Sequence, residues 1–142
     1  MTLLASFGAG ALFYSVMAGR MVTRLGQLGL AAFGAIALAT GFAGLACMPW
    51  AWLAVPAITL IGLGFYMLHN TLQTNATQMA PEARGLSMSL FAFMLFAGQS
   101  AGVALAAPVM DRYGGQLIFL LASVIILAIA FWFRQELLRK PA

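Results

Sequence analysis

Five long apolar runs, separated by charged, polar or proline-containing stretches, constrain this fold more than any other feature. A helix needs about 20 apolar residues to cross a bilayer core about 30 Å thick. The predicted spans cover residues 2–19, 27–46, 51–72, 85–107 and 116–133. The connections are short, so neighbouring helices must run antiparallel without an extramembrane domain between them. The sequence therefore predicts an all-α polytopic membrane bundle that occupies residues 1–142 as one unit.

The amino-acid composition excludes other classes of protein. Hydrophobic residues make up 63% of the chain and charged residues 7%, whereas a soluble domain is roughly half apolar and about a quarter charged. The basic residues stand singly or in pairs, so they form no patch for nucleic acid, and we expect the lipid bilayer as the partner. Cys47 and His69 are the only residues of their types. With no metal-ligand set and no nucleophile and base pair, we expect neither a cofactor nor enzyme activity.

Most of the basic residues fall on one side of the membrane when alternate connections are assigned to alternate sides. One side receives Arg20, Arg24, Arg84, Arg134, Arg139 and Lys140, and the other receives Arg112. Because short basic loops stay in the cytoplasm, we expect the amino terminus outside and the carboxyl terminus in the cytoplasm. Trp50 and Trp52 lie between the second and third spans, and Trp132 lies near the inner end of the fifth. These aromatic rings agree with this orientation, since they favour the membrane interfaces.

Polar side chains recur along one side of the third span. Tyr66, His69, Asn70, Gln73 and Thr77 stand at three- and four-residue steps and therefore share one helix face. Polar groups in hydrocarbon must be satisfied, so this polar stripe should face the bundle interior or a water-filled cavity, where a transporter handles its substrate. Alternatively, these residues only hydrogen-bond to adjacent helices or mark the inner interface. His69 could also relay protons, although no span holds an acidic partner for it.

The fourth span carries small and polar residues near its middle. Gly98 and Gly102 are spaced so that a neighbouring helix could pack closely against both. Gln99 and Ser100 lie beside them. Because an unpaired amide in hydrocarbon is costly, we expect a partner helix to cover them, and Gln99 serves either packing or substrate contact. The fifth span is apolar all round, which suits a peripheral helix that faces lipid.

The connection after the first span has a characteristic pattern of glycine and charge. It reads Gly19-Arg20-Met21-Val22-Thr23-Arg24-Leu25-Gly26-Gln27. This run resembles the loop signature of the major facilitator superfamily of transporters, in which a glycine precedes an aspartate-arginine pair, a second glycine and a basic residue. Gly19, Arg24 and Gly26 match the signature. Thr23 occupies the position of the aspartate, and Gln27 that of the last basic residue.

A second motif precedes the fourth span. It reads Pro81-Glu82-Ala83-Arg84-Gly85 and follows Gly64-Phe65-Tyr66-Met67-Leu68-His69-Asn70-Thr71. The run resembles the loop before the eleventh helix of bacterial twelve-helix drug and metabolite exporters of this superfamily, with Pro81, Arg84 and Gly85 as the matching residues. On this resemblance the five spans correspond to helices eight through twelve. The implied fold is a partial major facilitator fold from the carboxyl-terminal half of a transporter.

The resemblance implies a substrate cavity between two six-helix halves, lined by the tenth helix, which is the third span here. It implies that Tyr66, His69 and Asn70 contact a small-molecule substrate, with Gln73 at the cytoplasmic mouth of the cavity. The expected function is secondary transport by an exporter of the bacterial inner membrane, with proton coupling left open. The amino-terminal helices are then missing partners, and this fragment alone is expected to be inactive. The alternative is an assembly or interaction subunit without transport activity.

Overall fold

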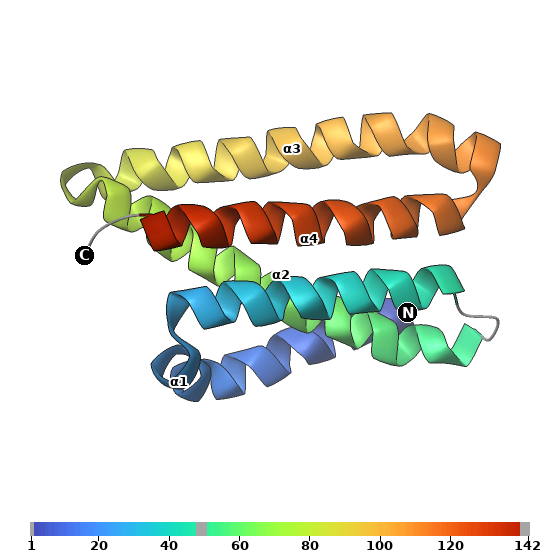
Figure 1. The fold of residues 1–142 in the computed structure, drawn as a ribbon, viewed down its shortest axis with the longest axis horizontal. Coiled ribbons are helices and arrows are strands. Elements are labelled where there is room, and N and C mark those ends of the chain that lie inside the picture. The colour runs from blue at the N-terminus through green and yellow to red at the C-terminus, as the bar shows by residue number, and fades with distance from the viewer. Residues whose placement is uncertain (1, 48–50, 140–142) are drawn as a thin grey trace.

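In the computed structural model, which describes residues 2–47 and 51–139, every regular element is helical. The elements are α1 (Thr2–Cys47), the 3-10 helix η1 (Ala51–Leu53), α2 (Ala54–Met79), the 3-10 helix η2 (Pro81–Ala83), α3 (Arg84–Tyr113) and α4 (Gly115–Arg139), as Figure 1 shows. Within the described residues, four helices are long and apolar enough to cross a membrane. The predicted all-α polytopic bundle is therefore confirmed. Trp50 and Lys140 lie outside the described residues.

The long helix α1 consists of two segments that meet at Gly26. This glycine has φ 62° and ψ −176°, a conformation that is essentially restricted to glycine. Figure 1 shows that the chain turns back here, so the two segments run in opposite directions. Residues 2–25 are the first segment of α1 and residues 27–47 are the second segment. The single helix α1 thus covers the first two predicted spans.

Successive helices run antiparallel along the bundle. In Figure 1 the turn at Gly26, the connection between α2 and α3, and the carboxyl end of α4 lie at one end of the molecule. This basic end carries Arg20, Arg24, Arg84, Arg134 and Arg139. Arg112 lies at the opposite end, beside the turn between α3 and α4. The basic residues are therefore separated in space in the way that alternating connections require.

Helix α2 extends beyond the apolar span predicted from hydropathy and ends at Met79. Polar side chains in its last turns form hydrogen bonds with backbone carbonyls of the same helix. Asn75 Nδ2 donates to the Thr71 carbonyl at 2.8 Å, and Thr77 Oγ1 donates to the Thr74 carbonyl at 2.8 Å. These local hydrogen bonds are compatible with a continuous helix, so the polar composition of the segment does not end it.

Helix α3 also differs from its predicted span, because Pro108 lies inside the helix and not in the turn after it. A membrane helix can tolerate an internal proline when the freed backbone group finds another partner. The helix ends where Gly114, with φ 78°, donates its backbone N–H to the Met110 carbonyl at 2.9 Å. The turn toward α4 therefore depends on Gly114 and not on Pro108.

Glycines let α2 pack closely between the two segments of α1. On one side, Gly62 faces the backbone of Phe7 and Gly10 faces the backbone of Thr59, so neither position has room for a Cβ atom. On the other side, a Cβ atom at Gly41 would lie 2.8 Å from the carbonyl oxygen of Ala57. Small residues thus allow direct backbone contact between membrane helices, where lipid provides no hydrophobic drive for association.

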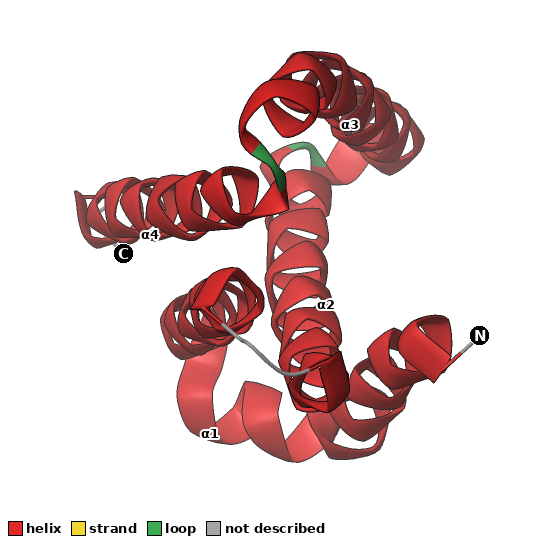
Figure 2. Cartoon of the chain, turned by 90° about the vertical axis from the view of Figure 1, so that its right-hand side faces the viewer, coloured by secondary structure: helices red, strands yellow, loops and turns green. Residues whose placement is uncertain are grey.

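The buried core lies between these same elements. Tyr14, Leu30 and Met67 are 4%, 3% and 2% exposed and pack together from the two segments of α1 and from α2. Helix α4 packs on the second segment of α1, where Ser123 Oγ donates to the Ala39 carbonyl at 3.0 Å. Helix α3 has no buried residue. Figure 2 shows α3 standing apart from both segments of α1, so this helix contributes little to the core.

Candidate functional site

The polar stripe of α2 lies between two different neighbours. Tyr66 meets the first segment of α1, where its ring centroid is 6.1 Å from that of Phe7. His69 faces α3, and its ring centroid is 5.4 Å from that of Phe91. Figure 2 shows α2 between α3 and the first segment of α1, with no other described helix across this side. Tyr66 and His69 therefore border the open side between the first segment of α1 and α3, and the residues of the stripe are half-buried.

His69 is held between two aromatic rings. Phe65 stacks on the imidazole with centroids 5.5 Å apart and an interplanar angle of 15°, and Phe91 is tilted against it by 55°. The Nδ1 atom is buried and has no hydrogen-bond partner. An unsatisfied buried polar atom costs about 1–3 kcal/mol. His69 Nδ1 is therefore the atom of the stripe that would gain most from an added hydrogen-bonding group.

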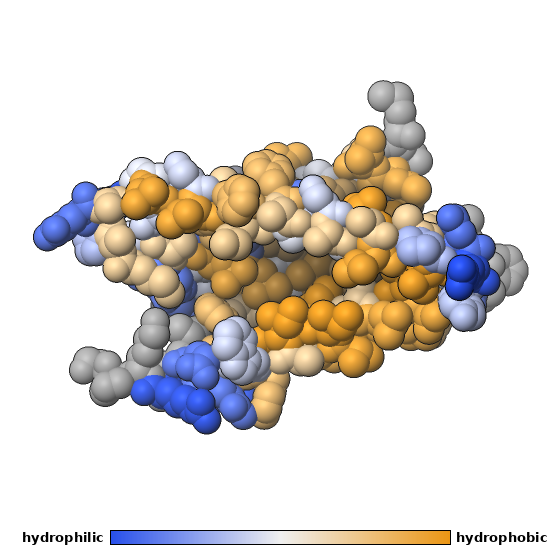
Figure 3. Space-filling model, turned by 90° about the horizontal axis from the view of Figure 1, so that it is seen from above, coloured by the Kyte–Doolittle hydropathy of each residue, from blue (hydrophilic) through white to orange (hydrophobic). Residues whose placement is uncertain are grey.

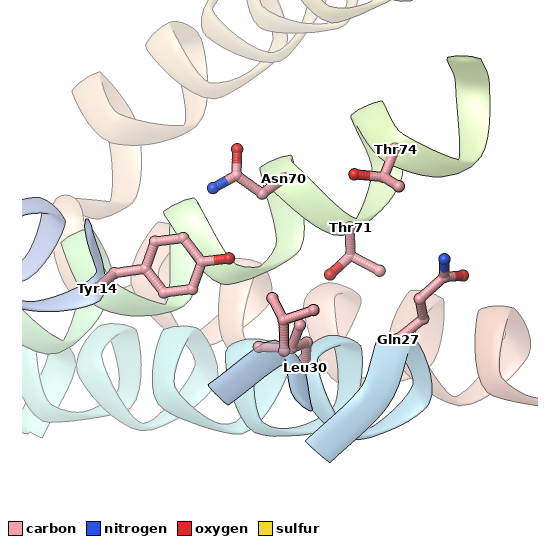
Figure 4. Close-up of a pocket in the computed structure, with 7 residues that line it drawn as sticks. Tyr14, Gln27, Leu30, Asn70, Thr71 and Thr74 are labelled. Atoms are coloured by element: carbon pink, nitrogen blue, oxygen red, sulfur yellow. The ribbon is translucent and has the colours of Figure 1, made fainter. Parts of the chain in front are cut away.

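Asn70 lines a small cavity between α2 and the two segments of α1, with a volume of about 80 Å³. The other lining residues are Tyr14, Val22, Gln27, Leu30, Thr71 and Thr74. Figure 4 shows the Tyr14 hydroxyl directed toward the region between Asn70 and Thr71. Ligand pockets usually measure about 300–1,000 Å³, so this cavity suits a few water molecules better than a substrate. Asn70 thus lines a small cavity that combines polar and apolar side chains of α1 and α2.

Gln73 and Gln99, the two glutamines expected at the site, have different surroundings. Gln73 faces α3, and its Nε2 donates a weak hydrogen bond to Met88 Sδ at 3.7 Å. Gln99 is exposed on α3, where it lines an open depression with Ser100. It does not meet the polar stripe of α2. A Cβ atom added at Gly98 or Gly102 would have nothing within 4 Å. No described helix covers this face of α3, which is where a partner helix was expected.

The first loop motif forms the turn of α1. Gly26 supplies the positive φ, and Thr23 Oγ1 donates to the Gly19 carbonyl at 2.9 Å within the preceding helical turn. Arg24 is exposed. Gln27 Nε2 donates to Gln78 Oε1 at 3.4 Å, which joins this turn to the end of α2. Gln27 thus occupies the position where the motif has a basic residue. Its contact with Gln78 is a hydrogen bond between two neutral amides.

The second loop motif forms the connection between α2 and α3. Pro81 begins η2, and the N–H of Ala83 donates to the Ala80 carbonyl at 3.0 Å. Arg84 is the first residue of α3 and is exposed at the basic end. The Gly85 carbonyl accepts a hydrogen bond from Ser89 Oγ at 3.0 Å. The motif thus reverses the chain within a few residues and starts the next helix.

The interpretation of the sequence missed two residues of this small cavity, Tyr14 and Thr71. Tyr14 is 4% exposed and Thr71 is 3% exposed. Tyr14 is a single polar aromatic residue within the first predicted span, and Thr71 follows Asn70 directly. Thr71 was missed because it does not follow the three- and four-residue steps of the polar stripe, so it was assigned to another face of the helix. Among the described residues, no three His, Cys, Asp or Glu side chains come close enough together to hold a metal ion.

Four helices long and apolar enough to cross a membrane, within the described residues, define a multi-pass membrane protein. Comparison with protein families gives a match to the major facilitator family described as transmembrane secretion effector, over residues 1–141. The chain belongs to this family, and its general function is membrane transport. No curated protein and no solved structure matches the chain significantly.

Proposed function

We propose that these helices line the substrate path of a secondary transporter that exports small molecules. The observation that carries the proposal is that Tyr66 and His69 border the open side of α2 between the first segment of α1 and α3, while Asn70 lines the cavity between α2 and α1. Polar residues within membrane spans mark substrate or ion pathways because they are costly elsewhere in the bilayer. His69 Nδ1 and the Asn70 amide would supply hydrogen bonds to a substrate. Phe65 and Phe91 would supply apolar contact beside them.

The proposed path needs a second group of helices. In this family architecture, one helical bundle rocks against another around a central site. The uncovered side of α2 and the lack of burial along α3 support such a partner. We therefore assign the described helices to helices eight through twelve of a carboxyl-terminal half. The missing amino-terminal helices would close the site. The basic end then faces the cytoplasm of a bacterial cell, since short basic loops are retained there.

Within the described helices, His69 is the candidate residue for proton coupling. The acidic residues Glu82, Asp111 and Glu136 stand near the ends of helices, whereas His69 lies within the apolar part of α2. A coupled transporter would therefore pass its proton through the imidazole, or through a residue of the partner helices. Transport driven by a substrate gradient alone requires neither route.

A second function remains as an alternative, and the exposed face of α3 favours it. Gly98 and Gly102 are four residues apart with open space around them, which would admit a helix of another membrane protein. In this alternative the chain is an interaction or assembly subunit without transport activity. The two functions differ in whether the polar stripe of α2 is needed.

Dye efflux from bacterial cells tests the proposal. The strains would express the chain alone or the chain fused to the amino-terminal helices of a related family transporter. The fused form would also carry His69→Ala, Asn70→Ala or, as a control, Gln116→Ala, which changes an exposed polar residue of α4 far from the stripe. Membrane insertion of each form is measured by cell fractionation.

We expect export only by the fused form, and at least a tenfold loss for each stripe variant against no loss for Gln116→Ala. Export by the chain alone would contradict the need for a second bundle. Equal activity of the stripe variants and the fused parent would contradict the assigned site. If the fused form inserts and exports none of a broad dye panel, the subunit alternative is favoured.

A further inference from the structure

The small cavity between α2 and the two segments of α1 has an exposed mouth and a buried floor. The exposed lining residues are Val22, Gln27 and Thr74, and the buried ones are Tyr14, Leu30 and Thr71. The mouth lies at the basic end, because Gln27 directly follows the turn at Gly26. On the face that Figure 3 shows, hydrophilic side chains gather at the two ends of the molecule, with hydrophobic side chains between them. Water outside the bilayer therefore reaches the cavity from the basic end.

Tyr14 directs a buried polar group into this cavity. The residue is 4% exposed, and Figure 4 shows its hydroxyl directed toward the region between Asn70 and Thr71. No hydrogen bond joins this hydroxyl to another described residue. Buried tyrosine hydroxyls usually find a hydrogen-bond partner, because an unsatisfied one is costly. The Tyr14 hydroxyl therefore requires a ligand inside the cavity.

The other polar lining groups include both donors and acceptors. Thr71 Oγ1 donates its proton to the Met67 carbonyl at 2.8 Å, so the lone pairs of this oxygen remain for another donor. Gln27 Nε2 donates to Gln78, which leaves Gln27 Oε1 as an acceptor. The Asn70 amide both donates and accepts, and it forms no hydrogen bond with another described residue. None of the lining residues is a carboxylate.

The size and chemistry of the cavity restrict its ligand. The volume is about 80 Å³, whereas one water molecule needs roughly 10–15 Å³ and an organic ligand about 300 Å³ or more. A cation would bind only the oxygen atoms, and no carboxylate would balance its charge. Water donates and accepts, as this lining requires. Water is therefore the ligand that the cavity favours.

We infer that the cavity binds a few ordered water molecules, and that Tyr14 acts through them to hold the side chain of Asn70 in place. Tyr14 belongs to α1 and Asn70 to α2, so the water joins two helices. An amide has several hydrogen-bonding positions, which lets Asn70 bind water on one side and a substrate on the other. Tyr14 is thus a positioning residue. Its effect on transport rests on the proposed function, whereas the water site does not.

Hydroxyl-radical labelling of the full chain in detergent tests the water site. A microsecond X-ray pulse makes radicals from water, and these oxidise the side chains beside that water. Oxidation is measured by mass spectrometry, with Tyr113, which is 68% exposed, as the reference. We expect Tyr14 to be oxidised at a rate comparable with that of Tyr113, although its burial alone predicts protection.

A matched pair of threonine variants tests whether the cavity holds this water. Thr71→Val removes one hydrogen-bond partner of the water and should slow the oxidation of Tyr14 about fivefold. Thr77→Val should leave it unchanged. Both substitutions remove a hydrogen bond to a carbonyl of the same helix, so the pair differs in the cavity. Circular dichroism checks the helices, and Thr74→Val replaces Thr71→Val if the latter unfolds.

A double-mutant cycle tests the link between Tyr14 and Asn70. Tyr14→Phe and Asn70→Ala should each lower the folding equilibrium constant in detergent about fivefold, because each removes a partner of the water. The double variant should lose little more than one single variant, since either change releases the shared water. Tyr113→Phe, at an exposed position, is the control and should have no effect.

Dye efflux by the fused form separates positioning from packing. If Tyr14 orients Asn70, then Tyr14→Phe should raise the dye concentration for half-maximal efflux about fivefold and keep the maximal rate, because substrate affinity is lost and folded protein is not. A purely structural role would lower the maximal rate through the amount of inserted protein and leave the half-maximal concentration unchanged.

Two kinds of result would overturn the proposal. Protection of Tyr14 from oxidation, or equal oxidation in Thr71→Val and Thr77→Val, would mean that Tyr14 meets no water bound in this cavity. Additive losses in the cycle, or an unchanged half-maximal concentration, would mean that Tyr14 does not position Asn70. If the fused parent exports no dye, the proposed function fails, while the labelling and the cycle still decide the water site.

Discussion

Gly64 of α2 and Gly34 of the second segment of α1 face each other so closely that a Cβ atom on Gly64 would lie 2.5 Å from the Gly34 carbonyl oxygen. The two helix backbones would have to separate to admit a methyl group there. Overpacking of this kind typically costs about 1–3 kcal/mol. Gly64→Ala is therefore expected to lower the free energy of unfolding by about that amount, measured by denaturant unfolding in mild detergent.

Gly98→Ala is the matched control for this helix contact. An added Cβ atom at Gly98 would have nothing within 4 Å, and alanine is the better helix former by up to about 1 kcal/mol. We expect unchanged or slightly raised stability. An equal loss in both variants would mean that the cost comes from the change of glycine itself and not from the contact between α1 and α2.

A second prediction concerns the turn of α1. Gly26 combines φ 62° with ψ −176°, which residues with a side chain adopt only at a cost of about 1–3 kcal/mol. Gly26→Ala should reduce stability by that amount, even though a Cβ atom there would meet no neighbour within 4 Å. Thermal unfolding in detergent measures the loss. Gly19→Ala is the control, because Gly19 has similar open space but lies within the helix.

If Gly19→Ala and Gly26→Ala had the same effect, backbone strain would not explain the turn. Gly26→Asn adds a sharper test. Asparagine tolerates the ordinary left-handed helical region, but the extended ψ at Gly26 lies outside that region. Rescue of stability by asparagine would therefore indicate that the turn has a different conformation.

A third prediction concerns the contact that holds α4 on the bundle. Ser123 Oγ donates to the Ala39 carbonyl at 3.0 Å across two helices, and Ser123 is 8% exposed. Hydrogen bonds between membrane helices contribute about 0.6 kcal/mol on average and up to about 2 kcal/mol. Ser123→Ala should lower the free energy of unfolding within this range, measured in the same detergent. Ser100→Ala, on the exposed face of α3, should have no measurable effect. A comparable loss at Ser100 would show that removal of any serine hydroxyl lowers stability in this assay, and that the loss at Ser123 does not report this contact.

Hydropathy was sufficient to predict the helical membrane bundle, because the cost of exposed backbone in lipid leaves few other structures for runs of this length. The ends of α2 and α3 were harder. Asn75 and Thr77 are polar, yet they bond to carbonyls of their own helix, which composition does not reveal. The predicted fourth span ended before Pro108, whereas α3 continues through Pro108 to Tyr113 and the turn follows at Gly114. Local hydrogen bonds and positive φ angles thus decided the boundaries.

The periodicity of α2 predicted which polar residues share a face, but it could not predict their neighbours. His69 contacts Phe91 of α3, whereas Tyr66 contacts Phe7 of α1. Which neighbour each residue meets depends on how α3 and α1 cross α2. Gln99 was grouped with the site because an amide in lipid needs a partner, yet none of the described helices supplies one. Contacts between helices depend on their relative positions, which a single sequence with repeated apolar spans does not specify.

The last prediction separates the two interpretations of the polar stripe at His69. A phenylalanine at this position can keep ring contact with Phe65 and Phe91 while it removes the unpartnered Nδ1 atom. Removal of an unsatisfied buried atom should leave stability unchanged or raise it by about 1 kcal/mol. If Nδ1 contacts substrate, His69→Phe in the fused transporter should nevertheless reduce dye efflux at least tenfold.

Packing alone predicts the opposite pattern of results. If His69 only fills space between Phe65 and Phe91, then His69→Phe should keep both efflux and thermal stability, whereas His69→Ala should lose stability because it removes the ring. Measuring both variants for efflux and for unfolding in detergent therefore distinguishes the two roles. A stable, inserted and inactive His69→Phe protein supports substrate contact, because loss of packing cannot explain it. A stable and fully active protein would assign His69 to the contact between α2 and α3 and leave Asn70 as the residue of the stripe to test next.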